Sequence, residues 1–323
     1  MSKVYSLPSH IKEDLKLVEE ELLGIVASKK GKLAEASLAT LKAGGKRLRP
    51  ILVLLAGTIN DYDLSKLMPA AVAVELIHTA SLIHDDVLDG ADTRRGFPTV
   101  NAAWDETIAI STGDYLFGMA FEILSKLNNP YFVKIMSEAV LALSVGELYQ
   151  MKTYHSLNQT VDDYLFKIKN KTAFLFSVAC LMGATLSGAK ETEIEAMGKY
   201  GENLGMAFQI YDDVLDISGD KETLGKPIGI DLKDGIVTMP VFFALEEITT
   251  GECLQKVVEN VNSTEEEIRE AISIIESTSA IERTKDKAKK FIERALESIE
   301  LITDAGTKRG LYSIGEFVID RYH

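Results

Sequence analysis

The sequence of 323 residues contains few of the residues that define several structural classes: two cysteines, seven prolines and one tryptophan. Two cysteines are too few for a disulfide framework, and Cys180, which lies in an apolar run, is expected to be a small buried thiol. The low proline content and the 46% of hydrophobic residues exclude collagen-like and disordered chains. A chain of this length can bury roughly 75% of its unfolded surface, as a large globular protein does.

Basic charge is also scarce, because 49 acidic residues outnumber 35 basic ones and leave a net charge of −14. Non-specific binding of nucleic acid needs a net basic surface, so nucleic acid is not an expected partner. An anionic substrate would have to be held by localised cations or by metal ions. The N-terminal segment Met1–Pro8 lacks the apolar stretch of a signal peptide, and we expect a cytoplasmic protein.

Signals of β-structure are missing from most of the chain. Residues 131–226 contain no proline, and no stretch alternates between apolar and polar residues for long enough to suggest a sheet. Apolar residues instead recur at helical spacing in Ala73–Ala80 and Leu204–Leu215. Residues 263–301 are typical of amphipathic helices that begin at the cap Ser263–Thr264. These patterns predict an all-α fold with a single domain over residues 1–323.

One segment, Thr172–Ala189, carries no charge over a length that could span a membrane. Six of its residues are Ser, Thr or Gly, and no second candidate span is evident. We interpret it as a helix buried inside a large helical protein and expect no integral membrane segment.

The pentapeptide Asp-Asp-Val-Leu-Asp occurs twice, at Asp85–Asp89 and at Asp212–Asp216, each time at the end of an apolar helical run. The first and last aspartates of each copy are four residues apart, so on a helix their carboxylates share one face and repel each other. A solvated acidic face would explain either copy alone, but the repetition within hydrophobic helices favours neutralisation by cations. Carboxylate oxygens that work together with water suit Mg²⁺, which commonly binds substrate phosphates as well. Two facing copies therefore predict a diphosphate held between metal ions.

Basic residues accompany these acidic motifs, and a His and a Gln share their helical faces. A loop at Gly44–Pro50 precedes a helix whose first turn accommodates Pro50, an arrangement that can bind anions. Any single cation could be an ordinary salt-bridge partner, and His78 fits a core residue as well as a ligand. The candidates are Lys46, Arg47 and Arg49 in that loop, Arg94, Arg95, Lys171 and Thr172, Lys226 and Lys233 in the loop Gly225–Gly235, His78 before the first repeat and Gln209 before the second.

These motifs and their order resemble the trans-isoprenyl (polyprenyl) diphosphate synthase family. The resemblance is carried by Gly44–Pro50, His84–Gly96, Gly113–Leu116, Lys171–Thr172, Gln209–Asp216 and Gly225–Pro227. It implies an isoprenoid-synthase helical bundle with a deep central cavity between the two aspartate helices.

The resemblance also implies roles for individual residues. By the family pattern, three magnesium ions are held by Asp85, Asp86, Asp89, Asp212, Asp213 and Asp216, two of the ions by Asp85 and Asp89 and the third by Asp212 with Asp216. Isopentenyl diphosphate matches Lys46, Arg49, His78 and Arg95, and the allylic diphosphate matches Arg94, Lys171, Thr172, Gln209 and Lys226. The residues expected to act in catalysis are Asp85, Asp89, Asp212, Lys171 and Lys226.

The implied reaction is ionisation, condensation and elimination, which adds a C5 unit to the allylic substrate in trans geometry. Side chains on a helix lean towards its N-terminus, so Ala80 and Ser81 are expected to form the wall beside the growing tail. Both are small, which in the family is typical of products of about C30–C50, best heptaprenyl, for a quinone side chain such as that of menaquinone. A short-chain geranylgeranyl or farnesyl diphosphate synthase is the alternative.

The chain resembles both the catalytic subunits of two-component heptaprenyl diphosphate synthases and homodimeric polyprenyl synthases, so a homodimer and a heteromer with a small non-catalytic subunit stay open. More remote alternatives are a class I terpene cyclase and a non-catalytic regulatory subunit. The second aspartate repeat with Lys46 and Arg49 argues against a cyclase. The complete set of acidic and basic positions argues against a subunit without catalysis.

Overall fold

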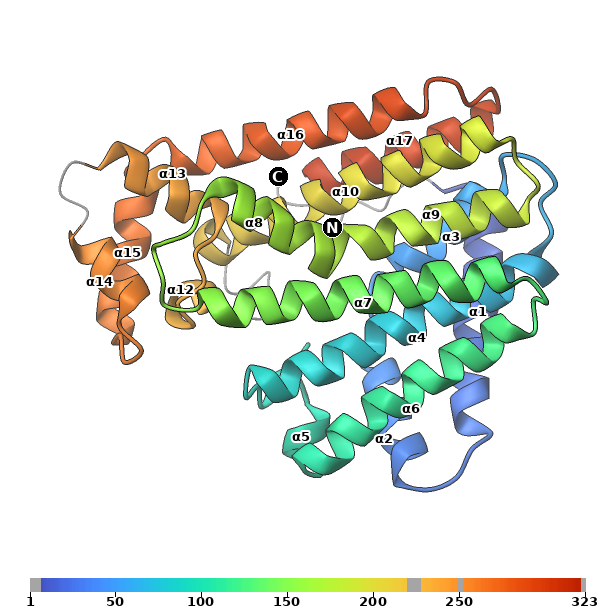
Figure 1. Ribbon diagram of the computed structural model, residues 1–323, viewed down its shortest axis with the longest axis horizontal. Coiled ribbons are helices and arrows are strands. Elements are labelled where there is room, and N and C mark those ends of the chain that lie inside the picture. The colour runs from blue at the N-terminus through green and yellow to red at the C-terminus, as the bar shows by residue number, and fades with distance from the viewer. Residues whose placement is uncertain (1–6, 220–227, 249–251, 321–323) are drawn as a thin grey trace.

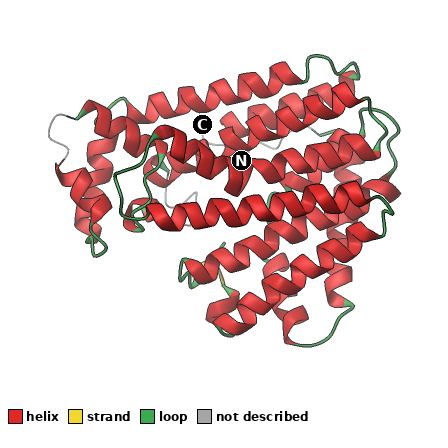
Figure 2. Ribbon diagram, in the orientation of Figure 1, coloured by secondary structure: helices red, strands yellow, loops and turns green. Residues whose placement is uncertain are grey.

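The computed structural model describes residues 7–219, 228–248 and 252–320, and these are almost entirely helical (Figure 2). The all-α prediction is confirmed. The helices of the N-terminal half are α1 Ser9–Ala27, α2 Lys32–Lys42, α3 Leu48–Gly57, α4 Leu64–Leu88, α5 Val100–Ala103, α6 Glu106–Ser125 and α7 Pro130–Thr153. Those of the C-terminal half are α8 Val161–Ile168, the π-helical turn η1 Lys169–Ala173, α9 Phe174–Leu186, α10 Glu191–Ser218, α12 Ile230–Lys233, α13 Met239–Glu247, α14 Glu252–Glu259, α15 Glu265–Glu276, α16 Ala280–Ser298 and α17 Ala305–Asp320.

The only strands among the described residues form a two-stranded antiparallel ribbon, β1 Thr93–Arg94 and β2 Phe97–Pro98, which the sequence did not predict. The ribbon directly follows the first aspartate repeat, and its residues are too few to give a periodic pattern. It turns the chain back, so that Arg94 returns to the end of α4.

Long helices pack in pairs around the centre of the bundle. The α4 helix lies along α6, and α10 lies between α9 and α16, while α3 packs against α9 (Figure 1). The smaller helices α13, α14 and α15 gather at one end of the molecule (Figure 1). This arrangement matters for function because α4 and α10 carry the two aspartate repeats near their C-terminal ends.

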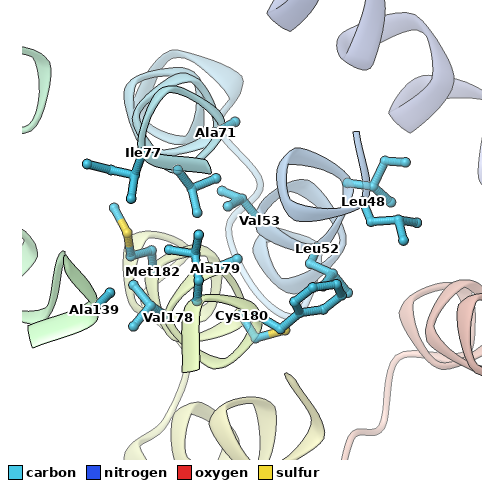
Figure 3. Packing of buried hydrophobic residues seen from close by; sticks show 14 of the residues in the cluster. Leu48, Leu52, Val53, Ala71, Ile77, Ala139, Val178, Ala179, Cys180 and Met182 are labelled. Atoms are coloured by element: carbon cyan, nitrogen blue, oxygen red, sulfur yellow. The ribbon is translucent and has the colours of Figure 1, made fainter. Parts of the chain in front are cut away.

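The core between these helices is filled by aliphatic side chains. Figure 3 shows Ile77 of α4 facing Met182 of α9, with Val53 of α3 and Ala139 of α7 close to the same cluster. All four are almost completely buried. Each large aliphatic side chain buried in this way contributes about 1.5–3 kcal/mol to stability. A second, smaller cluster joins α12–α16 around Val241 and Ile272.

Helix boundaries agree with the sequence in some places and not in others. Thr264 caps α15 and forms a capping box with Glu267, as predicted. The apolar segment Thr172–Ala189, predicted as one helix, is divided because its first residues belong to the π-helical turn η1 and α9 ends at Leu186. The single domain over residues 1–323 stays a prediction.

The expectation that no second candidate span exists was wrong, because a helix other than Thr172–Ala189 has the length and composition of a membrane-spanning helix. That helix is α4, Leu64–Leu88, and 67% of its apolar window is buried within the protein. Its apolar residues pack on α3, α6 and α9, as those of a core helix do. The segment that begins at Thr172 does not meet the criterion once η1 interrupts it.

Close helix contacts depend on glycines. A Cβ atom at Gly183 of α9 would lie 2.1 Å from the backbone oxygen of Val53 in α3. A Cβ atom at Gly113 of α6 would lie 2.1 Å from Nε2 of His84, near the end of α4. At Gly183 only glycine allows the two helices to approach as they do, whereas a side chain at position 113 would require the His84 ring to move.

We expect Gly183→Ala to lower the free energy of unfolding by about 1–3 kcal/mol, because the added methyl group meets backbone that cannot move aside easily. Gly24→Ala is the matched control: Gly24 lies exposed in α1 with nothing within 4 Å of the added Cβ. Urea denaturation followed by circular dichroism measures both variants. Equal stability of the two would contradict this account of the α3–α9 contact.

Candidate active site

The first repeat ends α4, and its two outer aspartates share one face. Loss of solvation raises the pKa of Asp85 to about 7, and the negative charges of Glu147 and Asp89 act in the same direction. The pKa of Asp89 is also raised, first by loss of solvation. The positive charge of Lys171 opposes the rise at both aspartates. The first repeat is therefore an acidic cluster with one nearby lysine.

The second repeat lies near the end of α10 and meets different neighbours. Asp216 accepts hydrogen bonds from the backbone N–H groups of Ile230 (3.1 Å) and Asp231 (3.0 Å) at the start of α12. Loss of solvation nevertheless raises the pKa of Asp216 to about 8, and the charge of Asp231 adds to the rise. Asp231 is thus an additional acid of this cluster that the sequence analysis missed, although it lies within the loop Gly225–Gly235.

The middle aspartate of each repeat is engaged within the protein. Asp86 is buried, and its Oδ1 accepts from both Nε and Nη2 of Arg94, each at 2.7 Å. The carboxylate of Asp213 is buried too and accepts from Tyr164 Oη (2.6 Å) and from Gln209 Nε2 (3.0 Å). These two aspartates therefore hold an arginine and a glutamine next to the site, and their predicted metal role stays a prediction.

The side chain of Gln209 connects the second repeat to η1. Its Oε1 accepts a hydrogen bond from Thr172 Oγ1 (2.8 Å), while its Nε2 donates to Asp213. The structure thus brings Thr172, Gln209 and Asp213 together from two elements that are distant in sequence.

Two lysines on neighbouring turns connect the acidic clusters. Lys171 forms an ion pair with Glu147 of α7, and its charge interacts with Asp85 and Asp89. Lys167 is buried with its Nζ 5.4 Å from the ring centre of Tyr164, and its charge interacts with Asp213. The charges of the two lysines also act on each other. The sequence analysis missed Lys167 and Glu147. Glu147 did give a signal, because it is an acid that directly follows the uncharged run of residues 139–146 in α7.

A second group of cations surrounds a pocket beside α4. Arg47, His78, Arg94 and Arg95 are among its lining residues, together with the buried acid Glu75. Burial lowers the pKa of His78 well below its ordinary value, and the nearby arginines lower it further, so the imidazole is neutral.

Arg47 is fixed as an anchor of this pocket. It donates to Glu75 Oε1 (2.8 Å), to Glu19 Oε1 (3.2 Å) and to the backbone oxygen of Leu41 (2.9 Å). Its left-handed backbone (φ 49°) begins α3. These bonds hold the Gly44–Pro50 segment against α1 and α4.

Arg49 lies in the first turn of α3, not in the preceding loop as predicted, because α3 already begins at Leu48. Its guanidinium lies over the ring of Phe176 at 4.6 Å, and its Nε is buried without a hydrogen-bond partner. Loss of solvation lowers the pKa of Arg49 to about 10, while Glu75 and Asp212 oppose this. An arginine that is still charged, with a buried unpaired N–H, is suited to an anionic ligand.

The remaining predicted residues fall in three places. Lys46 is exposed, with its Nζ 5.3 Å from the ring centre of Phe317 in α17. Ser81 is half-buried on the face of Asp85 and donates to the backbone oxygen of His78 (2.9 Å), whereas Ala80 is fully buried in the core. Lys226 lies outside the described residues. The wall formed by Ala80 and Ser81 stays a prediction.

The donor atoms of the site fit magnesium. All of the aspartates offer oxygen, which hard cations prefer. No three His, Cys, Asp or Glu side chains within residues 7–219, 228–248 and 252–320 are arranged to hold an ion alone. Phosphate oxygens and water would have to complete the coordination, as is usual for Mg²⁺.

Comparisons with known proteins agree with this geometry. Residues 30–275 match the family model described as polyprenyl synthetase. Heptaprenyl diphosphate synthase component 2 of Geobacillus stearothermophilus is 41% identical over 298 residues, which cover 92% of each chain. The geranylgeranyl diphosphate synthase of Methanosarcina mazei is 36% identical over 307 residues, or 94% of this chain and 93% of the relative.

Solved structures are similar over nearly the whole chain. The heptaprenyl diphosphate synthase of Staphylococcus aureus has a TM-score of 0.91 and 34% identity, covering 97% of this chain and 99% of that one. The polyprenyl synthase of Caulobacter crescentus, complexed with calcium and isoprenyl diphosphate, has a TM-score of 0.91 and 32% identity, covering 97% and 96%. With two aspartate clusters around buried cations and these similarities along its length, the chain belongs to the polyprenyl synthetase family and is a prenyltransferase.

Proposed function

We propose that this prenyltransferase condenses isopentenyl diphosphate with an allylic prenyl diphosphate by magnesium-assisted ionisation, condensation and elimination. One observation carries the proposal: each aspartate repeat faces its own lysine, and the two lysines lie close enough for their charges to act on each other. Lys171 interacts with Asp85 and Asp89, and Lys167, whose charge acts on Lys171, interacts with Asp213. Alternating acidic and basic groups suit the binding of a diphosphate, because the lysines can contact it directly and the aspartates can hold metal ions that contact it.

Binding of the allylic substrate is assigned to the side chains between the repeats. Lys171 and Thr172 of η1, Gln209 of α10 and Arg94, which Asp86 holds, would contact its diphosphate, with Lys226 as a further predicted contact. Bound magnesium, expected as three ions on Asp85, Asp89, Asp212 and Asp216, supplies positive charge that stabilises the departing diphosphate. The buried setting of Lys171 strengthens its interaction with the same group.

Isopentenyl diphosphate is assigned to the neighbouring pocket, which Arg95 and His78 line. Arg49 and Lys46, which come from the adjacent Gly44–Pro50 segment, are its further predicted contacts. In the reaction, the carbon–oxygen bond of the allylic substrate breaks and its electron pair leaves with the diphosphate. The double bond of isopentenyl diphosphate then attacks the allylic carbon. Loss of a proton, with the released diphosphate as acceptor, restores a double bond.

The product is proposed to be a medium or long trans-prenyl diphosphate, best heptaprenyl, for a quinone side chain. The small side chains of Ala80 and Ser81 support this, as do the names of the heptaprenyl relatives. A geranylgeranyl product is the alternative that the Methanosarcina relative supports. We also propose that the chain forms a single domain and acts in the cytoplasm.

A partner is proposed to bind an exposed apolar stripe of α7. Leu141, Val145 and Leu148 follow one face at helical spacing and are 65%, 48% and 55% exposed. A second copy of the chain or a small non-catalytic subunit would cover them. The Geobacillus relative's description as a component of a synthase supports the second possibility.

We expect Asp85→Asn and Asp212→Asn each to reduce kcat roughly 100- to 1,000-fold, because each removes a charge that holds a cation at the leaving group. Radiolabelled isopentenyl diphosphate with farnesyl diphosphate and Mg²⁺ measures the loss. The exposed Asp286→Asn of α16 serves as the control. Chain elongation at the normal rate by either site variant would exclude the proposed mechanism.

We expect Ser81→Phe to shorten the product by at least one C5 unit, because the ring would fill space beside Asp85. Ser81→Ala, which removes the bond to His78 without adding volume, should leave the length unchanged. Chromatography of the dephosphorylated products reads out both. An unchanged length for Ser81→Phe would reject the wall assignment.

We expect the double variant Leu141→Glu, Leu148→Glu to lose its assembly while it stays folded, because charges replace apolar contacts at the stripe. Sedimentation velocity of the wild type and the variant measures the change. Activity of the purified wild type alone indicates a homodimer, whereas activity only after a second component is added indicates a heteromer. An assembly that survives both substitutions would place the interface elsewhere.

A further inference from the structure

Glu147 is a largely buried acid whose presence beside the first repeat needs a reason. Its side chain is 13% exposed, and it lies in the apolar part of α7. Its charge raises the pKa of Asp85 and of Asp89, so it opposes their ionisation. A third carboxylate at this place is unfavourable unless it has a specific partner.

That partner is Lys171. The carboxylate of Glu147 forms an ion pair with the Lys171 ammonium, and among the described residues no other group donates a hydrogen bond to its oxygens. Lys171 is itself pulled towards Asp85 and Asp89 by their charges. Glu147 therefore competes with the first repeat for the same ammonium group.

The residue before Glu147 contacts the backbone of the same lysine. A Cβ atom on Gly146 would lie 2.7 Å from the backbone nitrogen of Lys171 and 3.1 Å from its Cα. Lys171 belongs to the π-helical turn η1, and such turns commonly occur at functional sites. Gly146 lets the wide turn approach α7, and Glu147 then fixes the direction of the side chain.

We propose that Gly146 and Glu147 together position Lys171. They hold its ammonium away from Asp85 and Asp89, so that these carboxylates stay available to metal ions and Lys171 stays directed at the allylic diphosphate. This inference rests on the proposed function, in which Lys171 binds that diphosphate. Glu147 is a positioning residue in this scheme and does not contact substrate.

The test is a double-mutant cycle on the full-length protein with Glu147→Gln, Lys171→Ala and the combination. Glu147→Gln keeps the shape of the side chain and removes its charge. We expect it to lower kcat/KM for farnesyl diphosphate about 10- to 100-fold, as loss of a supporting contact typically does, with KM for isopentenyl diphosphate unchanged. In the Lys171→Ala background the same substitution should change kcat/KM by less than about 3-fold, because its effect passes through Lys171.

Two further variants separate positioning from folding. Glu147→Asp retains the charge and should restore part of the activity, and Gly146→Ala should lower kcat/KM for farnesyl diphosphate in the same way as Glu147→Gln. Glu138→Gln, at an exposed acid paired with Lys134 on the same helix, is the control that should change nothing. Thermal unfolding of every variant identifies any that lost activity by misfolding.

The outcomes separate failure of the positioning role of Glu147 from failure of the proposed function of Lys171. Wild-type activity of Lys171→Ala would overturn the assigned role of Lys171 in the proposed function. If Lys171→Ala is impaired but Glu147→Gln is silent, or if the two losses are fully additive, the positioning role is wrong and the proposed function stands. An altered Mg²⁺ requirement for Glu147→Gln in the Lys171→Ala background would make Glu147 a metal ligand and likewise overturn the inference.

Discussion

The structure depends on burying like-charged carboxylates, because loss of solvation acts on the aspartates of both repeats. Loss of solvation disfavours ionised Asp85 and Asp216 and raises their pKa values to about 7 and about 8. Among the described residues, Lys171 acts on Asp85 and Asp89 and Lys167 acts on Asp213, so each repeat has a lysine that offsets part of its charge. In the proposed function, metal ions and a diphosphate would complete this charge balance, so the excess negative charge of the aspartates would favour binding of the metal–substrate complex.

Two arginines near the site are held in fixed positions by acidic side chains outside the outer aspartates of the repeats. Arg47 is fixed by Glu75 and Glu19, and Arg94 is fixed by Asp86. A guanidinium that is already held by a carboxylate loses little conformational freedom when it binds an anion. The anchoring acid therefore lowers the entropic cost of binding. Arg49 differs, because it lies on Phe176 and keeps its buried Nε unpaired. The arginines near α4 thus differ: Arg47 and Arg94 are anchored by acids, and Arg49 keeps a donor unpaired.

The sequence predicted the features that are local or repeated. The helical pattern, the two pentapeptides and the cap at Thr264 all depend on residues within a few positions of each other. The roles of Glu147 and Lys167 could not be predicted from spacing, because they come from contacts between distant elements. Glu147 of α7 pairs with Lys171 of η1, and Lys167 of α8 acts on Asp213 of α10. The π-helical turn at Lys171 was also hidden, since residues 161–186 have a continuous helical composition and the close contact of the turn with Gly146 comes from a distant part of the sequence. Arg49 was wrongly placed in the loop because α3 begins at Leu48, two residues before Pro50, after Arg47 in a left-handed conformation.

Identical pentapeptides acquire different electrostatics from their surroundings. In the first repeat the middle aspartate, Asp86, meets a charged partner, Arg94, and the outer aspartates face Lys171. In the second, Asp213 meets the neutral Tyr164 and Gln209, and Asp216 meets backbone amides together with another acid, Asp231. The charge of Lys167 also acts on Asp213, but the direct hydrogen bonds of the second cluster come from neutral donors, which offset less negative charge than the guanidinium on Asp86 does. Under the proposed function, in which both repeats hold ions at the same diphosphate, identical sequences can therefore bind those ions unequally, because different helices pack against each repeat.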